Sequence, residues 1–252
     1  MSDPAPRLES CPRYPVPWDL LAGLGPHIAR GTRTSVDAFT AEVVGRMVPP
    51  PEVSGTEHLP AKARFVLAAN HYQRKGLWIL HAASALTQAI RQHYGPGDPP
   101  VRWMVTANWP RIRVGRFSVP SPGDILLPRV AHVWSCYPVS FVRTNPAYTA
   151  RSIRRILTEL PQSNRPLGLF PEGAHGVAGQ IAHALPGVSR LLTRLSSLGV
   201  PVVPVGVSER DRLTLRFGAT ISIDELRDAD DAATLVLDRI RKLAEMNSLR
   251  DL

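Results

Sequence analysis

His71 stands where an apolar stretch of the sequence gives way to a helical one. Residues 65–69 are typical of a buried strand, and residues 77–83 predict the first turns of a helix. The end of a strand opens toward ligands, and the positive end of a helix dipole favours neutral imidazole. Because neutral imidazole accepts protons, this placement indicates a general base.

The composition predicts one main globular domain with a basic surface. The chain has 252 residues, of which 44% are hydrophobic, and carries a formal charge of +9 from 30 Lys+Arg against 21 Asp+Glu. Such an excess attracts a phosphate-bearing substrate, an anionic lipid surface or nucleic acid. We do not expect nucleic acid, because the sequence has no recognition-helix signature and no basic stretch interleaved with stacking aromatics.

The location of the protein is expected to be the cytoplasm, at the inner face of a membrane. The sequence has two distant cysteines, Cys11 and Cys136, which favours a reducing compartment. The first residues lack the order of a signal peptide, and no window approaches the roughly 20 apolar residues of a spanning helix. We therefore expect peripheral contact with the membrane.

Prolines mark a boundary between two parts of the chain. Residues 1–51 predict a proline-rich arm followed by N-terminal helices, and residues 52–252 predict the main domain. The longer of these helices, over residues 35–47, is amphipathic. It either packs on the main domain or forms a membrane-surface element.

From Val53 onward, strands alternate with helices. This order predicts an α/β fold with a central, largely parallel or mixed sheet flanked by helices. Residues 108–135 contain four prolines and predict a long irregular excursion. The prolines at 201 and 204 place their strand near a sheet edge or end. The expected strands are 65–69, 101–105, 137–143, 167–170, 200–207 and 212–217, and the expected helices are 77–94, from 146, 187–198 and 231–245.

Four short motifs follow one another along the sequence, each in or next to a predicted strand. Asn70-His71 follows a strand, Arg143 ends another, Phe-Pro-Glu-Gly follows a third at residues 170–173, and a Val-Pro-Val-Val-Pro-Val strand follows a helix. Together they resemble the glycerolipid acyltransferases of the lysophosphatidate (1-acyl-glycerol-3-phosphate) acyltransferase type. The resemblance covers residues 53–226. It implies a glycerol-3-phosphate acyltransferase-like fold and a role in phospholipid biosynthesis.

The resemblance implies a reaction and its partners. His71 is the catalytic base that takes the proton from an acceptor hydroxyl as that oxygen attacks an acyl thioester. The acyl donor is acyl-CoA or acyl carrier protein, which acts as a co-substrate, and the acceptor is a glycerolipid such as lysophosphatidate or a related lipid. No cofactor is implied. The expected partners are therefore the donor, the lipid acceptor and an anionic membrane surface.

The same resemblance assigns substrate-binding roles. Arg143 matches the arginine that binds the acceptor's phosphate, for which a guanidinium offers a two-pronged match. Glu172 matches a glutamate associated with acceptor binding, and Gly173 allows close approach of the backbone. His175 stands where the family usually has arginine. Independently of the resemblance, the positive charge of Arg74 beside the histidine is expected to keep the imidazole neutral or to hold an anionic donor.

One departure from the family pattern affects the base. Gly76 occupies the position of the aspartate in the His-x4-Asp motif, which orients the imidazole. Three explanations remain open from the sequence. A carboxylate from elsewhere, such as Asp98, Asp124 or Glu172, orients His71; or the acceptor lacks the usual phosphate; or the protein is a catalytically impaired, lipid-binding relative.

Overall fold

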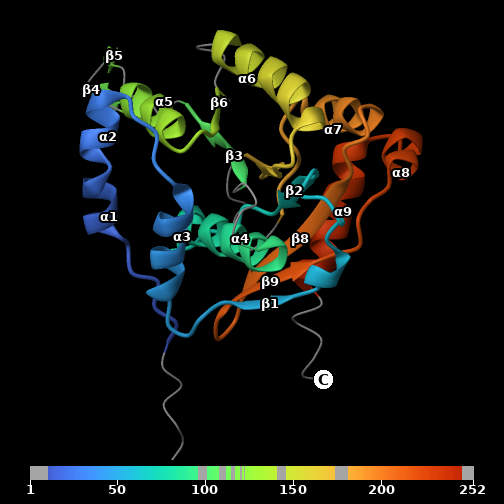
Figure 1. Ribbon diagram of the computed structural model, residues 1–252, viewed down its shortest axis with the longest axis horizontal. Helices are drawn as coiled ribbons and strands as arrows, with labels where there is room; N and C mark the ends of the chain where they lie inside the picture. The colour runs from blue at the N-terminus through green and yellow to red at the C-terminus, as the bar shows by residue number, and fades with distance from the viewer. Residues whose placement is uncertain are drawn as a thin grey trace, which may run out of the picture.

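In the part of the chain that the structure describes, seven strands form one sheet with helices on both faces (Figure 1). The structure is a computed structural model and describes residues 11–95, 101–107, 112–114, 117–119, 121, 123–140, 146–173 and 181–245. The strand order is β1 (Glu52–Ser54), β9 (Leu213–Phe217), β8 (Val202–Glu209), β2 (Val66–Ala69), β7 (Leu167–Leu169), β3 (Arg102–Thr106) and β6 (Tyr137–Val139).

Neighbouring strands of this sheet are parallel, except for the antiparallel pair β8 and β9. Two further short strands, β4 (Ile112–Val114) and β5 (Phe117–Val119), form a separate antiparallel pair. Each parallel connection needs a crossover, and helices supply most of them. The expected α/β fold with a largely parallel, mixed sheet is confirmed.

The helices divide between the two faces of the sheet. One face is covered by α3 (Val36–Gly45), α4 (Ile79–Tyr94) and α5 (Gly123–Val133). The other is covered by α6 (Pro146–Glu159), α7 (Val188–Ser197), α8 (Ile223–Asp228) and α9 (Ala232–Glu245). The short helices α1 (Trp18–Gly23) and α2 (Gly25–Arg30) precede α3, and 3₁₀ turns lie at Thr56–His58 and Leu160–Gln162.

Strand β2 lies at the centre of the sheet because both of its faces are apolar. Phe65, Leu67 and Ala69 pack into the core beneath α3 and α4, whereas Val66 and Ala68 pack into the core beneath α6, α7 and α9. Successive side chains of a strand point to opposite faces, so a strand buried on both sides needs an uninterrupted apolar run. The end of this strand is therefore firmly fixed in the interior.

Strand β8 lies inside the sheet, between β9 and β2, and not at its edge. Of the expected placement near a sheet edge or end, only the second fits, because Pro201 directly precedes the first residue of the strand. Its ladder with β9 runs only from Val205 to Glu209. Pro204 therefore stands beyond the end of that ladder, where its carbonyl still accepts a bond of 2.9 Å from the N–H of Gly218. The missing N–H of proline is tolerated there although the strand is central.

Helix α5 corrects the expected irregular stretch 108–135. The helix contains Pro128, which removes one intrahelical hydrogen bond and masks the helical pattern in the sequence. Ala131 and Val133 in its second half are buried. Packing of this half against the sheet therefore favours the helix despite the proline.

Helix α3 packs against α4 through its amphipathic face. Phe39 and Val43 are buried, and Gln88 of α4 donates a hydrogen bond of 2.7 Å to the hydroxyl of Thr40. Ser35 caps the helix by accepting the N–H of Asp37 at 3.2 Å. The helix thus packs on the main domain, and its role as a membrane-surface element stays a prediction. No helix in the described ranges has the length and apolar character that crossing a membrane requires.

Candidate active site

The pairing of β2 with β7 brings the histidine and the glutamate motifs together. The two strands are parallel, and the first three residues of β2 each lie opposite the residue 101 positions later, as in Val66 opposite Leu167. His71 and Glu172 have the same separation of 101 and follow the carboxyl ends of these neighbouring strands. The register of the sheet therefore places the two residues side by side.

Glu172 holds the backbone of His71. The residue is 4% exposed. Its Oε1 accepts the N–H of His71 at 2.8 Å, and its Oε2 accepts the N–H of Ala182 at 2.6 Å. Burial raises the pKa of Glu172 above its ordinary value, although the two N–H donors oppose this rise. The two carboxylate oxygens thus hold the backbone of His71 and the backbone of Ala182 in place.

Asn70 extends the hydrogen bonding of the sheet by one step beyond β2. Its Nδ2 donates to the carbonyl of Val207 at 2.9 Å, and its Oδ1 accepts the N–H of Val207 at 2.7 Å. The residue is 5% exposed. The amide therefore takes the place of a backbone pair and anchors the start of the loop that carries His71.

The imidazole of His71 lies against a stack of aromatic rings. Its ring meets Phe170 edge to face at a centroid distance of 5.5 Å, and Phe170 stacks on Trp103 at 4.9 Å. Gly168 makes room for the indole, because a Cβ there would lie 2.4 Å from Trp103. Nδ1 of His71 is buried. Packing thus restricts the orientation of the ring.

Gly76 ends a tight turn immediately after the histidine. Arg74 and Leu77 exchange backbone hydrogen bonds of 3.1 and 3.0 Å, and Gly76 has φ of +85°. Glycine adopts this left-handed conformation without the steric strain that other residues incur. The turn therefore gives a conformational reason for glycine at this position.

Arg74 is held by a buried carboxylate on the neighbouring strand. Its guanidinium makes a two-pronged ion pair with Glu209, whose side chain is 4% exposed, and lies 5.6 Å from the ring centre of Tyr14. The hydrogen bond to Glu209 raises the pKa of Arg74, and burial with the nearby Glu209 charge raises that of Tyr14. This cluster fastens the His71 loop to β8 and to the N-terminal segment.

A cavity of about 450 Å³ lies next to the anchored loop. Its lining includes Asn70, Tyr72 and Ile181, together with Arg241 from the end of α9. Such a volume lies within the usual range for small-molecule sites. No group of three or more potential metal ligands occurs among the residues that the structure describes.

The site residues expected from the sequence divide into two sets. His71, Glu172, Gly173 and Arg74 lie in the described part, and the structure brings His71 and Glu172 together. Arg143 and His175 lie outside the described residues, as does Asp98. Asp124, another candidate to orient the histidine, lies on α5 and lines a different cavity.

Several residues of the site were missed by sequence reasoning. Phe170 was noted only as part of a motif, and Trp103 and Glu209 were not singled out. An aromatic residue directly after a buried strand, followed by Pro-Glu-Gly, is the one signal that pointed toward Phe170. Glu209 lies 135 residues from Arg74 and carries no motif of its own.

The fold and the site together define a class of protein. This protein is an α/β protein whose largely parallel sheet carries a histidine and a buried glutamate after the carboxyl ends of two adjacent strands. The fold is similar to the crystal structure of the 1-acyl-sn-glycerophosphate (LPA) acyltransferase PlsC from Thermotoga maritima. The TM-score is 0.53 at 12% sequence identity, over 86% of this chain and 79% of that chain.

The sequence itself assigns the family. Residues 50–208 match the family model described as Acyltransferase. Because this match spans more than half of the chain, the chain belongs to the Acyltransferase family. No curated protein matches the chain at a significant level.

Proposed function

We propose that this protein transfers a fatty acyl group from an acyl thioester to a hydroxyl of a glycerolipid such as lysophosphatidate, or of a related lipid. The donor is acyl-CoA or acyl carrier protein. The observation that carries the proposal is the bond between Glu172 and the backbone of His71, which joins the two motifs of the family match into one site.

The reaction follows from the position of the imidazole. Nδ1 of His71 is buried, so the acceptor hydroxyl approaches Nε2. Nε2 takes the hydroxyl proton while the oxygen bonds to the thioester carbonyl carbon. The carbon–sulfur bond then breaks, and the departing thiolate receives the proton from the imidazolium. The acceptor oxygen is the nucleophile, so no acyl-enzyme forms.

Orientation of His71 does not use an aspartate at position 76 in this proposal. Gly76 makes the protein a divergent member that lacks the aspartate of His-x4-Asp. Glu172 positions the main chain of His71, and the edge contact with Phe170 restricts its ring. The buried carboxylate of Glu172 thus acts on the backbone of His71 and not on its imidazole.

The proposed substrate contacts follow the family pattern, with a change for two residues. Arg143 and His175 bind the polar head of the acceptor. The acceptor approaches the backbone of Gly173 on the side away from Leu185, whose side chain fills the position that a Cβ would take. Glu172 and Arg74 instead act chiefly as positioning groups, because their polar atoms are already engaged by backbone N–H groups and by Glu209.

We place the reaction at the inner surface of a membrane, where both the lipid acceptor and anionic headgroups are present. The charge of +9 favours such a surface, and the protein meets it peripherally. The alternative function is a lipid-binding relative without turnover. It is favoured by Gly76 alone.

Release of free thiol distinguishes the two functions. Purified protein is mixed with acyl-CoA or acyl carrier protein, with and without lysophosphatidate vesicles, and the thiol is titrated. We expect acceptor-dependent release by the wild type, none by His71→Ala, and normal release by His93→Ala, whose exposed imidazole on α4 is a matched control. Vesicle binding without release over a panel of donors and acceptors would support the lipid-binding alternative.

A further inference from the structure

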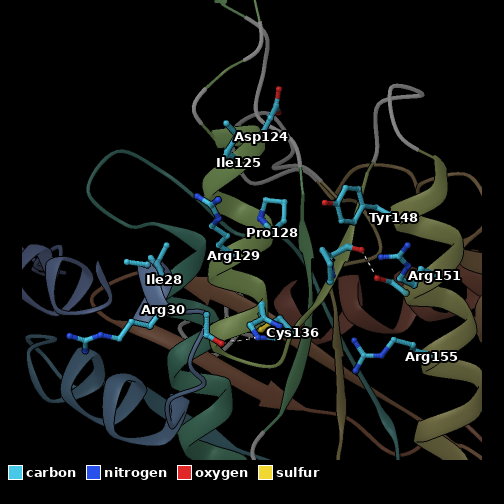
Figure 2. A pocket seen from close by; sticks show the side chains of 15 residues that line it. Ile28, Arg30, Asp124, Ile125, Pro128, Arg129, Cys136, Tyr148, Arg151 and Arg155 are labelled. Carbon is cyan, nitrogen blue, oxygen red and sulfur yellow. Dashed lines mark hydrogen bonds between the residues drawn. The ribbon is translucent and has the colours of Figure 1, made fainter. Parts of the chain in front are cut away.

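A second, larger cavity lies at the β6 edge of the sheet. It has a volume of about 820 Å³ and lies between α2, α5, β6 and α6 (Figure 2). None of the residues named above at the His71 site contributes to its lining, whereas Pro128 of α5, Pro138 of β6 and Tyr148 of α6 do. The cavity is therefore separate from the site around His71.

Arginines dominate the charge of this cavity. Arg129 stands on α5, and Arg151 and Arg155 extend from α6 toward α5 (Figure 2). Arg30 lies at the rim and extends away from the hollow in that view. Asp124 is the acidic residue of the lining.

The positive charge is only partly neutralised. Among the residues that the structure describes, Arg129 and Arg151 form no ion pair. Arg155 pairs with Glu159 at 2.9 Å, but the same carboxylate also accepts Arg102 at 2.6 Å. One carboxylate shared by two guanidinium groups leaves a positive excess. Guanidinium groups on facing helices match the oxygens of phosphates.

The shape of the cavity favours a small molecule with several phosphates. A volume of this size lies in the usual range for small-molecule sites, roughly 300–1,000 Å³, and exceeds what one phosphate needs. Tyr148 and the apolar side chains of Ile28 and Pro128 provide surfaces for a ring. A planar membrane surface contacts protruding side chains, whereas these groups line a hollow.

The distance to the catalytic strand fits one such molecule. Strand β6 is three positions from β2 in the sheet, which at about 4.8 Å per strand is roughly 14 Å. The phosphopantetheine arm of coenzyme A has thirteen chain bonds from phosphorus to sulfur, and by backbone dimensions it spans roughly 16 Å when extended, enough to cover this distance. A nucleotide bound at β6 can therefore present its thioester near His71.

We propose that this arginine-lined cavity binds the phosphorylated adenosine end of coenzyme A, and so selects acyl-CoA as the donor. The inference rests on the proposed acyl transfer and names the donor for it. Arg129 and Arg151 bind the phosphates, Arg155 adds positive charge beside them, and Tyr148 packs against the adenine ring.

Calorimetric titration tests the site without turnover. Coenzyme A, adenosine 3′,5′-bisphosphate and pantetheine are each titrated into wild type, Arg151→Gln and Arg129→Gln. The matched control is Arg154→Gln, an exposed arginine of α6 that does not line the cavity. We expect the two phosphorylated ligands to bind and pantetheine not to bind. Each cavity substitution should weaken binding about tenfold, from the loss of a charge-assisted hydrogen bond, while the control leaves it unchanged.

Kinetics separates failure of this inference from failure of the proposed function. Arg151→Gln should raise KM for acyl-CoA about tenfold and leave KM for acyl-pantetheine unchanged, because acyl-pantetheine lacks the nucleotide. Absence of transfer from either donor, with arginine-dependent binding of coenzyme A intact, would refute the acyl transfer but not the cavity. The assignment would be overturned if coenzyme A did not bind, or if Arg154→Gln weakened its binding as much as the cavity substitutions do. It would also be overturned if the cavity arginines were needed for binding anionic vesicles or acyl carrier protein but not for binding coenzyme A.

Discussion

Replacing Asn70 removes two hydrogen bonds that anchor the catalytic loop. In Asn70→Ala, the N–H and the carbonyl of Val207, bonded to the amide at 2.7 and 2.9 Å, lose their partners in a buried strand. Each unsatisfied buried group costs about 1–3 kcal/mol, and a carbonyl is tolerated better than an N–H. We expect the free energy of unfolding to fall by about 2–4 kcal/mol.

Asn70→Asp tests the same geometry through its pH dependence. The introduced carboxyl accepts the N–H of Val207, but its second oxygen faces the Val207 carbonyl, where only a donor fits. Ionisation is therefore disfavoured and the pKa of this carboxyl is raised in the folded state. Its contribution to stability is present at low pH and is lost as the pH rises through that raised pKa.

Urea denaturation at pH 5 and pH 8 measures both effects. The matched control is Thr158→Ala, which removes an exposed hydroxyl that donates to Arg154 at 2.9 Å. Its change should stay within about 0.5 kcal/mol. A loss of that small size in Asn70→Ala, or an Asn70→Asp variant equally stable at both pH values, would refute the anchoring role of Asn70.

Three further substitutions test the neighbouring contacts. Glu172→Gln keeps one acceptor and turns an amide donor toward the other N–H, so we expect a loss of about 1–2 kcal/mol at pH 5. Because the pKa of Glu172 is raised in the folded state, the free energy of unfolding of the wild type falls as the pH rises through that pKa, so the difference between the two proteins should be smaller at pH 8. Equal losses at the two pH values in urea titrations would contradict this. Gly168→Ala places a Cβ 2.4 Å from Trp103 and should cost about 1–3 kcal/mol in thermal denaturation, so an unchanged Tm would speak against the aromatic stack. Arg74→Met strands the buried Glu209 and should cost about 2 kcal/mol, less than a fully buried pair because 41% of the Arg74 side chain is exposed. Chemical denaturation measures this loss, and a variant as stable as the wild type would argue against a stabilising ion pair between Arg74 and Glu209.

Much of the fold was predictable because its strands are buried on both faces. Residues 65–69 and 167–170 are short apolar runs that end in polar motifs, and each forms a central strand. The sequence alone does not give the order of the strands, so the interior place of β8 was missed. Helix α5 was missed because Pro128 breaks its pattern and tertiary packing compensates.

The candidate site was predictable only in its motifs. His71 and Glu172 stood out because each follows a strand, but their contact depends on the register of β2 with β7. The sequence suggested that Glu172 binds the acceptor, whereas its oxygens accept two backbone N–H groups. Contacts such as Arg74 with Glu209 join segments far apart in the chain and leave no periodic signal.

The measurement that tests the central claim most directly is single-turnover transfer of a labelled acyl chain to lysophosphatidate. Wild type, His71→Ala and His93→Ala are compared at equal folded concentration, checked by circular dichroism, and the labelled diacyl product is quantified. We predict that His71→Ala lowers the rate at least about 100-fold, as expected for loss of a general base, while His93→Ala has no effect. Formation of product by His71→Ala at a rate close to that of the wild type would contradict the assignment of His71 as the base.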